Sequence, residues 1–395
     1  MMTKRLQRIR SVGIGGLVLA GLFLAGCGVD SREGRPLTTL DPQGSQAGKI
    51  QDLVKPVFIV AGVIFVLVEG VILWFMWRYR RRADDVDGID EPVQLHGNAK
   101  LEWTWTIAPA ILLAVMAIGN VTTIWALEGD QRDAQMEVEV IGQQWWWEFR
   151  YDNNADGQPD IITAQQMVIP AGTTVRVKIR SNDVIHSFWI PALNGKKDAV
   201  PGREHAIAIQ ADKPGIYEGQ CTEYCGLSHG YMRMQVKALS EADYAAWVAN
   251  QVKPAVEPIA GTEAAEGKAL FQARCMGCHQ IDGYSSDGTL AADNVRPDPD
   301  YLGAKHPLTS GNAPNMTHLM SRQRFAGNMF DLYTDDTTAA DVSPSGTPNV
   351  GLLGDWLRNP GAMKPMAADQ NRGMPKLGLS EDEIRKLVAY ITLLK

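Results

Sequence analysis

The chain has 395 residues, 45% of them hydrophobic, and a formal net charge of −7 at pH 7. This length allows two or three domains. The net charge is modest and no tract resembles a basic nucleic-acid surface, so no nucleic-acid partner is expected.

The N-terminal residues have the pattern of a secretory signal. A basic stretch, KRLQRIR, precedes a short apolar run that ends at Leu24-Ala25-Gly26-Cys27. A charged region, an apolar region and small residues before the cleavage point define such a signal. The ending also resembles the bacterial lipobox, in which the cysteine is lipidated and becomes the mature N-terminus. We expect a signal peptide over residues 1–26 and lipidation at Cys27, with an ordinary signal and a free or buried thiol as the alternative.

Two apolar segments, residues 56–77 and 106–127, follow the signal. Each is long enough to cross about 30 Å of hydrocarbon as a helix. Trp74, Trp77 and Trp125 lie near the ends of the segments, where aromatic residues anchor membrane helices. The alternative is a pair of buried helices in a soluble enzyme. The sequence therefore predicts a transmembrane hairpin over 56–127, in which Glu69, the one charged residue of either segment, has no assigned role.

The orientation of this hairpin follows from its basic residues. The tract RYRRR at 78–82 comes directly after the first segment. Short cytoplasmic loops are enriched in Lys and Arg, so the loop 78–105 is expected inside the bacterial plasma membrane. Residues 27–55 and everything after residue 127 are then expected on the external side.

Residues 128–252 are predicted to form an antiparallel β-sandwich. The runs MEVEVI, TVRVKIR and HAIAIQ alternate, or nearly alternate, between apolar and polar residues, with turn signals between them. A capping signature at Ser240 predicts a closing helix. Residues 253–261, which contain Pro254 and Pro258, read as a linker.

A cluster of soft metal ligands lies near the end of this β region. Cys221, Cys225, His229 and Met232 fall in the sequence CTEYCGLSHGYM. Thiolate and thioether ligands together with imidazole favour copper, because a structural zinc site rarely uses a thioether. A zinc site, or a disulfide between the two cysteines, is the alternative. His186, in DVIHSFWIP, could supply a further nitrogen or be a packed core histidine.

Residues 262–395 read as helical and carry a second motif. Cys275, Cys278 and His279 form the C-x-x-C-H signature of covalent haem c attachment, with His279 on the proximal side of the iron. A redox dithiol or half of a zinc site is the alternative. With two cysteines assigned to each site and Cys27 to lipidation, none of the five remains for a structural disulfide.

The distal haem ligand has several candidates. Met374 is favoured, because Pro375 biases it toward an extended loop conformation and the helix cap at Ser380 follows shortly after. Met366, preceded by Pro365, is the runner-up. The other candidates are Met316, Met320, Met329, Met363, His306 and His318.

The motif C-x-E-x-C-x3-H-x2-M, downstream of DVIHSF, resembles the CuA site of cytochrome c oxidase subunit II. That resemblance implies a binuclear copper centre in a cupredoxin-like fold, with two copper ions bridged by the two thiolates. It implies a backbone carbonyl ligand from the Glu and a further contact of its side chain with Mg at the border with subunit I. The implied copper ligands are His186, Cys221, Glu223, Cys225, His229 and Met232.

The same resemblance implies roles for other residues. Trp145, in QQWWW, occupies the place where electrons from cytochrome c enter, although with a tethered haem it could serve transfer within the chain; a packing residue is the alternative. Glu102 takes the position near the mouth of a proton channel in subunit I, or is a solvated carboxylate. Asp198 and Arg203, in KDAVPGR, are candidates for the subunit I interface.

The C-terminal region resembles a class I cytochrome c domain, with long loops at 282–315 and 331–350. The expected fold is a two-helix transmembrane hairpin, a cupredoxin-like antiparallel β-sandwich and an all-α cytochrome c domain. The expected function is the electron-accepting subunit of a proton-pumping cytochrome c oxidase, whose oxygen-reducing site lies in subunit I. Its partners would be the other oxidase subunits and an external cytochrome. Alternatives are a component of a nitric or nitrous oxide reductase, or a copper-delivery or electron-shuttle lipoprotein.

Overall fold

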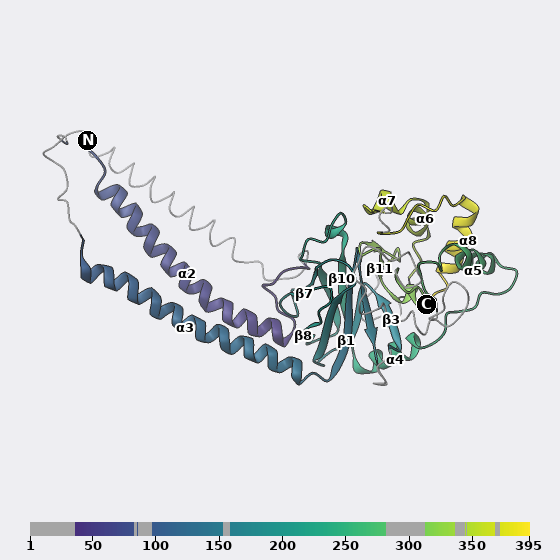
Figure 1. Ribbon diagram of the computed structural model, residues 1–395, viewed down its shortest axis with the longest axis horizontal. Coiled ribbons are helices and arrows are strands. Elements are labelled where there is room, and N and C mark those ends of the chain that lie inside the picture. Colours follow the sequence, from purple (N-terminus) through teal and green to yellow (C-terminus); the bar gives the residue numbers. More distant parts are fainter. Residues whose placement is uncertain are drawn as a thin grey trace.

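The computed structural model describes residues 36–82, 85, 97–152, 159–281, 313–335, 344, 346–367 and 372–395. The predicted signal peptide, Cys27, His306 and most of the two long loops of the cytochrome region lie outside these residues. A helical arm, a β domain and a smaller C-terminal helical domain follow one another along the molecule (Figure 1).

The arm consists of two long helices, α2 (Ser45–Arg78) and α3 (Ala99–Arg132), which lie side by side (Figure 1). They contain both predicted apolar segments, and the apolar stretch of each helix is exposed along its length, as for a helix that faces lipid or other chains. Where the arm meets the β domain, Lys49 Nζ lies 2.6 Å from Asp130 Oδ2, which ties the start of α2 to the end of α3.

The β domain is a sandwich of two sheets. Its apolar core includes Trp147, Phe149 and Phe188, none of which is exposed. One sheet has the order β3-β2-β1-β5-β8, the other β4-β10-β9, and β6 pairs with β7. The strands are β1 (Met136–Gln143), β2 (Trp146–Tyr151), β3 (Ile161–Ala164), β4 (Gln166–Pro170), β5 (Val175–Ser181), β6 (His186–Phe188), β7 (Lys197–Ala199), β8 (His205–Ile209), β9 (Gly215–Gln220) and β10 (Arg233–Leu239).

The sandwich confirms the expected architecture, but its strand directions are mixed. β1 pairs with β5 in parallel, and β10 pairs with β4 in parallel, while the other pairs in the two sheets are antiparallel. Alternation of apolar and polar residues reports which face of a strand is buried, and it is the same for either direction. The parallel pairs are therefore a property that the sequence pattern could not show.

The C-terminal domain begins after α4 (Glu241–Gln251), which Ser240 caps as predicted. The helix α8 (Glu381–Ile391) starts with a complete capping box between Ser380 and Glu383, and one of its faces is buried through Ile384, Leu387, Val388 and Ile391. The remaining elements are α5 (Glu263–Arg274), η1 (His229–Tyr231, in the copper loop), η2 (Leu319–Ser321), β11 (Arg324–Phe325), β12 (Phe330–Asp331), α6 (Val350–Arg358) and α7 (Pro360–Met363). In the residues that the structure describes, this domain is helical apart from the short hairpin β11-β12, which the all-α expectation did not include.

This helical domain is docked on the β4-β10-β9 sheet through polar contacts. Arg233 N donates to Gly327 O at 3.0 Å, so β10 and the hairpin β11-β12 share a backbone hydrogen bond. The buried Gln323 Oε1 accepts from Gln235 Nε2 at 3.0 Å and from Gln166 Nε2 at 3.3 Å. Buried amides that find their partners only across an interface define one relative position of the two domains.

The crossing of α5 and α8 gives a test of the C-terminal core. A Cβ on Gly267 would lie 2.0 Å from Lys386 O, so Gly267→Val must push the helices apart. We expect it to destabilise the domain by about 1–3 kcal/mol, the usual cost of overpacking. Amide hydrogen exchange of α5 and α8 in the full-length chain measures this loss.

Gly351→Ala is the control, because nothing lies within 4 Å of a Cβ at that helical position. It should leave exchange unchanged or slow it slightly, since Ala is the better helix former. If the amides of α5 and α8 exchange as slowly in the Gly267→Val variant as in the unaltered chain, the close crossing is contradicted.

Candidate copper and haem sites

The predicted copper ligands converge at one end of the sandwich. Cys221, Cys225, His229 and Met232 lie in the loop between the antiparallel strands β9 and β10, which hold its two ends together. The Sγ atoms of Cys221 and Cys225 are 3.8 Å apart. Cys225 Sγ also lies 3.5 Å from His229 Nδ1 and 3.8 Å from Met232 Sδ. The loop thus places two thiols, an imidazole and a thioether around one small space.

His186 reaches the same space from β6. Its Nδ1 lies 3.9 Å from Cys221 Sγ, and its ring is fully buried. His186, Cys221 and Cys225 together offer ligand atoms that all lie within 4.8 Å of one another. Gly142 is needed beside the ring, because a Cβ there would come within 2.8 Å of the imidazole. A thiol pair with histidine and methionine donors fits copper better than zinc.

The ring of His186 is held by a carboxylate on its other side. Asp183 Oδ1 lies 2.8 Å from His186 Nε2, and the Asp183 side chain is only 6% exposed. Burial by itself lowers the pKa of His186, but the hydrogen bond to Asp183 and the adjacent Cys221 raise that pKa to about 9. A carboxylate on the second ring nitrogen is the usual way in which a ligating histidine is oriented.

The two thiols behave as a pair. The hydrogen bond with Cys225 and the further bonds to His186 and the backbone lower the pKa of Cys221, and the same contact raises the pKa of Cys225. Cys221 is therefore the thiol of the pair that ionises more readily, and the thiolate is the form that binds metals.

Glu223 contributes its backbone at this site. Its carbonyl oxygen lies 3.3 Å from Cys221 Sγ, which places it among the predicted ligands. The carboxylate itself belongs to an exposed residue. The backbone of Glu223 thus lies beside the candidate copper ligands, while the residue is exposed at the surface. The predicted copper and Mg contacts concern these two separate groups.

The copper loop is anchored through the carbonyl of Cys225. This oxygen accepts hydrogen bonds from Trp145 Nε1 at 2.9 Å and from Gln144 Nε2 at 2.7 Å. Trp145 is 3% exposed, so its indole is packed between the copper loop and the C-terminal domain rather than open to an external protein. The packing and electron-transfer interpretations of Trp145 are therefore compatible.

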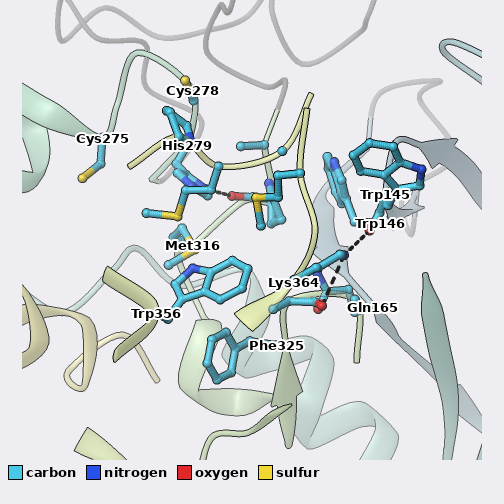
Figure 2. A pocket seen from close by; sticks show the side chains of 18 of the residues that line it. Trp145, Trp146, Gln165, Cys275, Cys278, His279, Met316, Phe325, Trp356 and Lys364 are labelled. Atoms are coloured by element: carbon cyan, nitrogen blue, oxygen red, sulfur yellow. Dashed lines mark hydrogen bonds between the residues drawn. The ribbon is translucent and has the colours of Figure 1, made fainter. Parts of the chain in front are cut away.

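A second site, the haem cavity, lies between the two domains. Its volume is about 1540 Å³, including space open to solvent, and its wall contains Cys275, Cys278, His279 and Trp145. Figure 2 shows the first three on one side of the view and Trp145 on the other, with Lys364 between them. His279 Nδ1 lies 2.8 Å from Pro314 O, so Nδ1 carries the proton and Nε2 keeps its lone pair for a metal.

Burial affects the titrating groups of the haem cavity. It raises the pKa of Cys275 to about 12 and lowers the pKa of His279, which keeps the imidazole neutral. Arg322, 3% exposed, also lines the cavity; its Nε donates to Thr163 Oγ1 at 3.1 Å and its Nη2 to Asn315 O at 2.5 Å. A buried guanidinium bonded only to neutral groups in the described contacts suits an anionic ligand. These residues fit a covalently held porphyrin with carboxylate groups.

The candidates for the distal ligand are reduced by the structure. Three methionines, Met316, Met366 and Met374, line the haem cavity. His318 has both ring nitrogens bonded to backbone carbonyls, Nδ1 to Lys395 O at 2.6 Å and Nε2 to Lys253 O at 2.9 Å. His318 therefore serves the packing of the C-terminus in this structure, and a sulfur ligand is favoured.

Three other predicted residues belong to neither cluster of candidate ligands, although Asp198 lies in β7, which pairs with β6 beside His186. Glu102 Oε1 accepts from Asn98 N at 3.1 Å while Asn98 Oδ1 accepts from Leu101 N at 3.2 Å, so Glu102 caps the start of α3. Asp198 and Arg203 are exposed, in and after β7, where another chain could reach them.

Several functional residues were not found from the sequence. Asp183 could have been, because it lies three residues before a suspected ligand histidine and metal-bound histidines usually have a carboxylate partner. Lys364 and Arg372 carried no such signal. Both residues line the haem cavity and donate hydrogen bonds to residues of the β domain. Burial lowers the pKa of Lys364 to about 7.

Comparison with known families agrees with this division. Residues 39–122 match the family "Cytochrome C oxidase subunit II, transmembrane domain" and residues 154–239 match "Cytochrome C oxidase subunit II, periplasmic domain". Residues 264–395 match the family "Cytochrome c". The first match makes α2 and α3 membrane spans, the second contains all six predicted copper ligands, and the third contains the haem motif.

Two curated relatives are similar to this chain over nearly its whole length. Cytochrome c oxidase subunit 2 of Alkalihalophilus pseudofirmus is 32% identical over 95% of this chain and 94% of its own length. The corresponding protein of Bacillus sp. PS3 is 30% identical over 95% of each chain. The crystal structure of the periplasmic domain of subunit II from Bradyrhizobium japonicum is 29% identical, with a TM-score of 0.28, and covers 30% of this chain and 94% of that one. The chain belongs to the cytochrome c oxidase subunit II family, and it is the subunit through which electrons enter the oxidase.

Proposed function

We propose that this subunit carries two redox centres and passes electrons between them. His186, Cys221, Glu223, Cys225, His229 and Met232 would hold two copper ions, and Cys275, Cys278, His279 and Met374 would hold one haem c. These groups supply the one-electron chemistry. The chain itself orients them, excludes water and links them to each other and to subunit I.

The observation that carries this proposal is the position of Trp145. Its ring forms part of the wall of the haem cavity, and its Nε1 donates to the carbonyl of Cys225 at 2.9 Å. One side chain therefore contacts both the candidate haem site and a candidate copper ligand. A copper-delivery protein would not need such a connection, and neither would a haem shuttle.

The electron path that follows starts at an external cytochrome, passes the haem on His279 and the copper pair, and leads to subunit I. Oxygen reduction and proton pumping would take place in subunit I, with Glu102 near its proton channel. Glu223, Asp198 and Arg203 would face it, and the side chain of Glu223 would bind Mg at that border. The relatives favour an oxidase over the nitric and nitrous oxide reductases.

The placement in the membrane is part of the same proposal. With the RYRRR tract at 78–82 on the cytoplasmic side, both the β domain and the cytochrome domain lie outside the bacterial plasma membrane. Lipidation at Cys27 would add an anchor on that side. Mass spectrometry of the mature N-terminus tests the lipidation at Cys27. A mature chain that begins with an unmodified residue before Cys27 contradicts it.

The copper assignment predicts two copper ions per chain and a mixed-valence absorption spectrum. Cys221→Ser or Cys225→Ser should abolish that spectrum, because each sulfur would bridge both metals. Met232→Leu should keep copper bound and shift its potential, since a thioether is the weakest ligand of the set. Metal analysis with electron paramagnetic resonance measures both. One copper per chain with a single-thiolate spectrum contradicts the binuclear site.

The role of Trp145 predicts a kinetic effect without a spectral one. Trp145→Phe keeps an aromatic ring but removes the hydrogen bond to Cys225 O. We expect electron transfer from the haem to the copper pair to slow. The copper spectrum should be unchanged, because Gln144 Nε2 still donates to Cys225 O at 2.7 Å. Laser-flash reduction of the haem followed at the copper absorption measures the rate. A rate equal to that of the unaltered chain would reduce Trp145 to a packing residue.

The distal ligand is tested by exchanging the two leading methionines. Met374→Ala should lower the haem potential and open the iron to carbon monoxide, because an axial methionine raises the potential. Met366→Ala is the matched control and should keep a six-coordinate, high-potential haem. The reverse outcome, with loss only in Met366→Ala, moves the ligand to Met366, which also lines the haem cavity.

A further inference from the structure

We propose that four residues of the cytochrome domain, Lys364, Pro365, Met366 and Arg372, form a clamp on the hydrogen-bond shell of the copper site. Lys364 and Arg372 act in it as positioning residues for electron transfer between the two centres. This inference rests on the proposed function and deepens it, because it names what fixes the haem cavity relative to the copper ligands.

The first contact of the clamp is made by Lys364. Its Nζ donates to Trp145 O in the copper domain at 2.6 Å and to Ala326 O in the cytochrome domain at 3.3 Å. Lys364 is 4% exposed, and a buried ammonium is tolerated only where its donors are satisfied. Because one of its acceptors belongs to each domain, Lys364 is satisfied in this buried position only when the two domains are docked.

The second contact is made by Arg372. Its Nε donates to Gln144 Oε1 at 2.9 Å and lies 3.9 Å from Asp183 Oδ2. Gln144 in turn donates to Cys225 O through Nε2 and to Asp183 Oδ2 through its backbone N, both at 2.7 Å. Asp183 holds the ring of His186. The guanidinium therefore contacts two groups that are each bonded directly to a candidate copper ligand.

Between these cations the backbone of the clamp touches the copper loop itself. Ser228 Oγ donates to Pro365 O, and Ser228 is fully buried next to His229. Met366, the following residue, lines the haem cavity. Pro365 and Met366 thus lie between the copper loop and the haem cavity. A movement of either site would therefore be transmitted to the other.

A consequence concerns access to Trp145. Its backbone carbonyl is bonded to Lys364 and its indole to Cys225 O, and only 3% of the residue is exposed. The clamp therefore closes the copper site to an external cytochrome, which must deliver its electrons to the tethered haem instead.

The test uses the whole purified oxidase with Lys364→Met or Arg372→Gln in this subunit. We expect haem-to-copper transfer to slow by about ten- to a hundredfold, since a misplacement of about 1 Å can cost up to about 10²-fold where geometry is critical. Arg372→Gln should also shift the copper potential and its paramagnetic spectrum, because it alters the partners of Asp183 and Gln144. The Trp145 residue should gain oxidation in hydroxyl-radical footprinting.

Two variants are matched controls. Arg358→Gln makes the same change of charge at an exposed site, where Arg358 pairs with Asp355 and Glu381 inside the cytochrome domain. Arg324→Gln breaks an ion pair of 3.0 Å to Glu218 across the same domain interface, but the side chain of Glu218 is bonded to Arg324 and Asn328 rather than to a candidate copper ligand. Both should keep the transfer rate and the copper spectrum.

The outcomes separate the clamp from the proposed function. An unaltered oxidase without the two-copper spectrum or covalent haem contradicts the proposed function. Hydroxyl-radical footprinting of Trp145 depends on neither the copper spectrum nor the covalent haem. If Trp145 stays equally protected in both clamp variants, the clamp is overturned. An unchanged transfer rate in both variants overturns it as well, and so does an equal loss in Arg324→Gln, which would show that docking alone is responsible.

Discussion

Both redox sites depend on the hydrogen bonds of one peptide group, the carbonyl of Cys225. Its oxygen accepts from Trp145 Nε1 and Gln144 Nε2, while the sulfur of the same residue lies among the other candidate copper ligands. The carbonyl and the thiol belong to the same residue, so the position of the carbonyl constrains the position of the thiol. Because Trp145 and Gln144 are in turn bonded to Lys364 and Arg372, the geometry of the copper site and the docking of the cytochrome domain are decided together.

The interface between the two domains contains several buried polar side chains. Gln166, Gln235 and Gln323 are buried there, and Arg324 pairs with Glu218. An apolar surface would tolerate small rotations, whereas buried amides and cations leave polar groups without partners when they are displaced. Such an interface therefore selects one arrangement of the domains. This precision matters for two centres that exchange electrons, because the rate depends steeply on their separation.

The fusion of the cytochrome domain to the β domain also changes what Trp145 can contact. In this chain Trp145 is covered, so it faces the chain's own haem cavity rather than solvent. The docked arrangement replaces an encounter between two diffusing proteins by a fixed contact. In the proposed function an external donor would recognise the cytochrome domain, while α2 and α3 form the membrane arm of the chain.

The sequence by itself determined the parts whose chemistry is local. Cys221 to Met232 places four soft ligands in one loop, Cys275 to His279 places the haem thiols beside the proximal imidazole, and apolar length identifies the two spans. The tertiary structure decided what comes from distant segments. His186 reaches Cys221 from 35 positions away, while Lys364 and Arg372 reach Trp145 and Gln144 across 219 and 228 positions. No periodicity or spacing reports such contacts, because they depend on how segments far apart in the sequence pack together in the folded chain. The parallel pairs β1–β5 and β4–β10 and the burial of Trp145 escaped the sequence for the same reason.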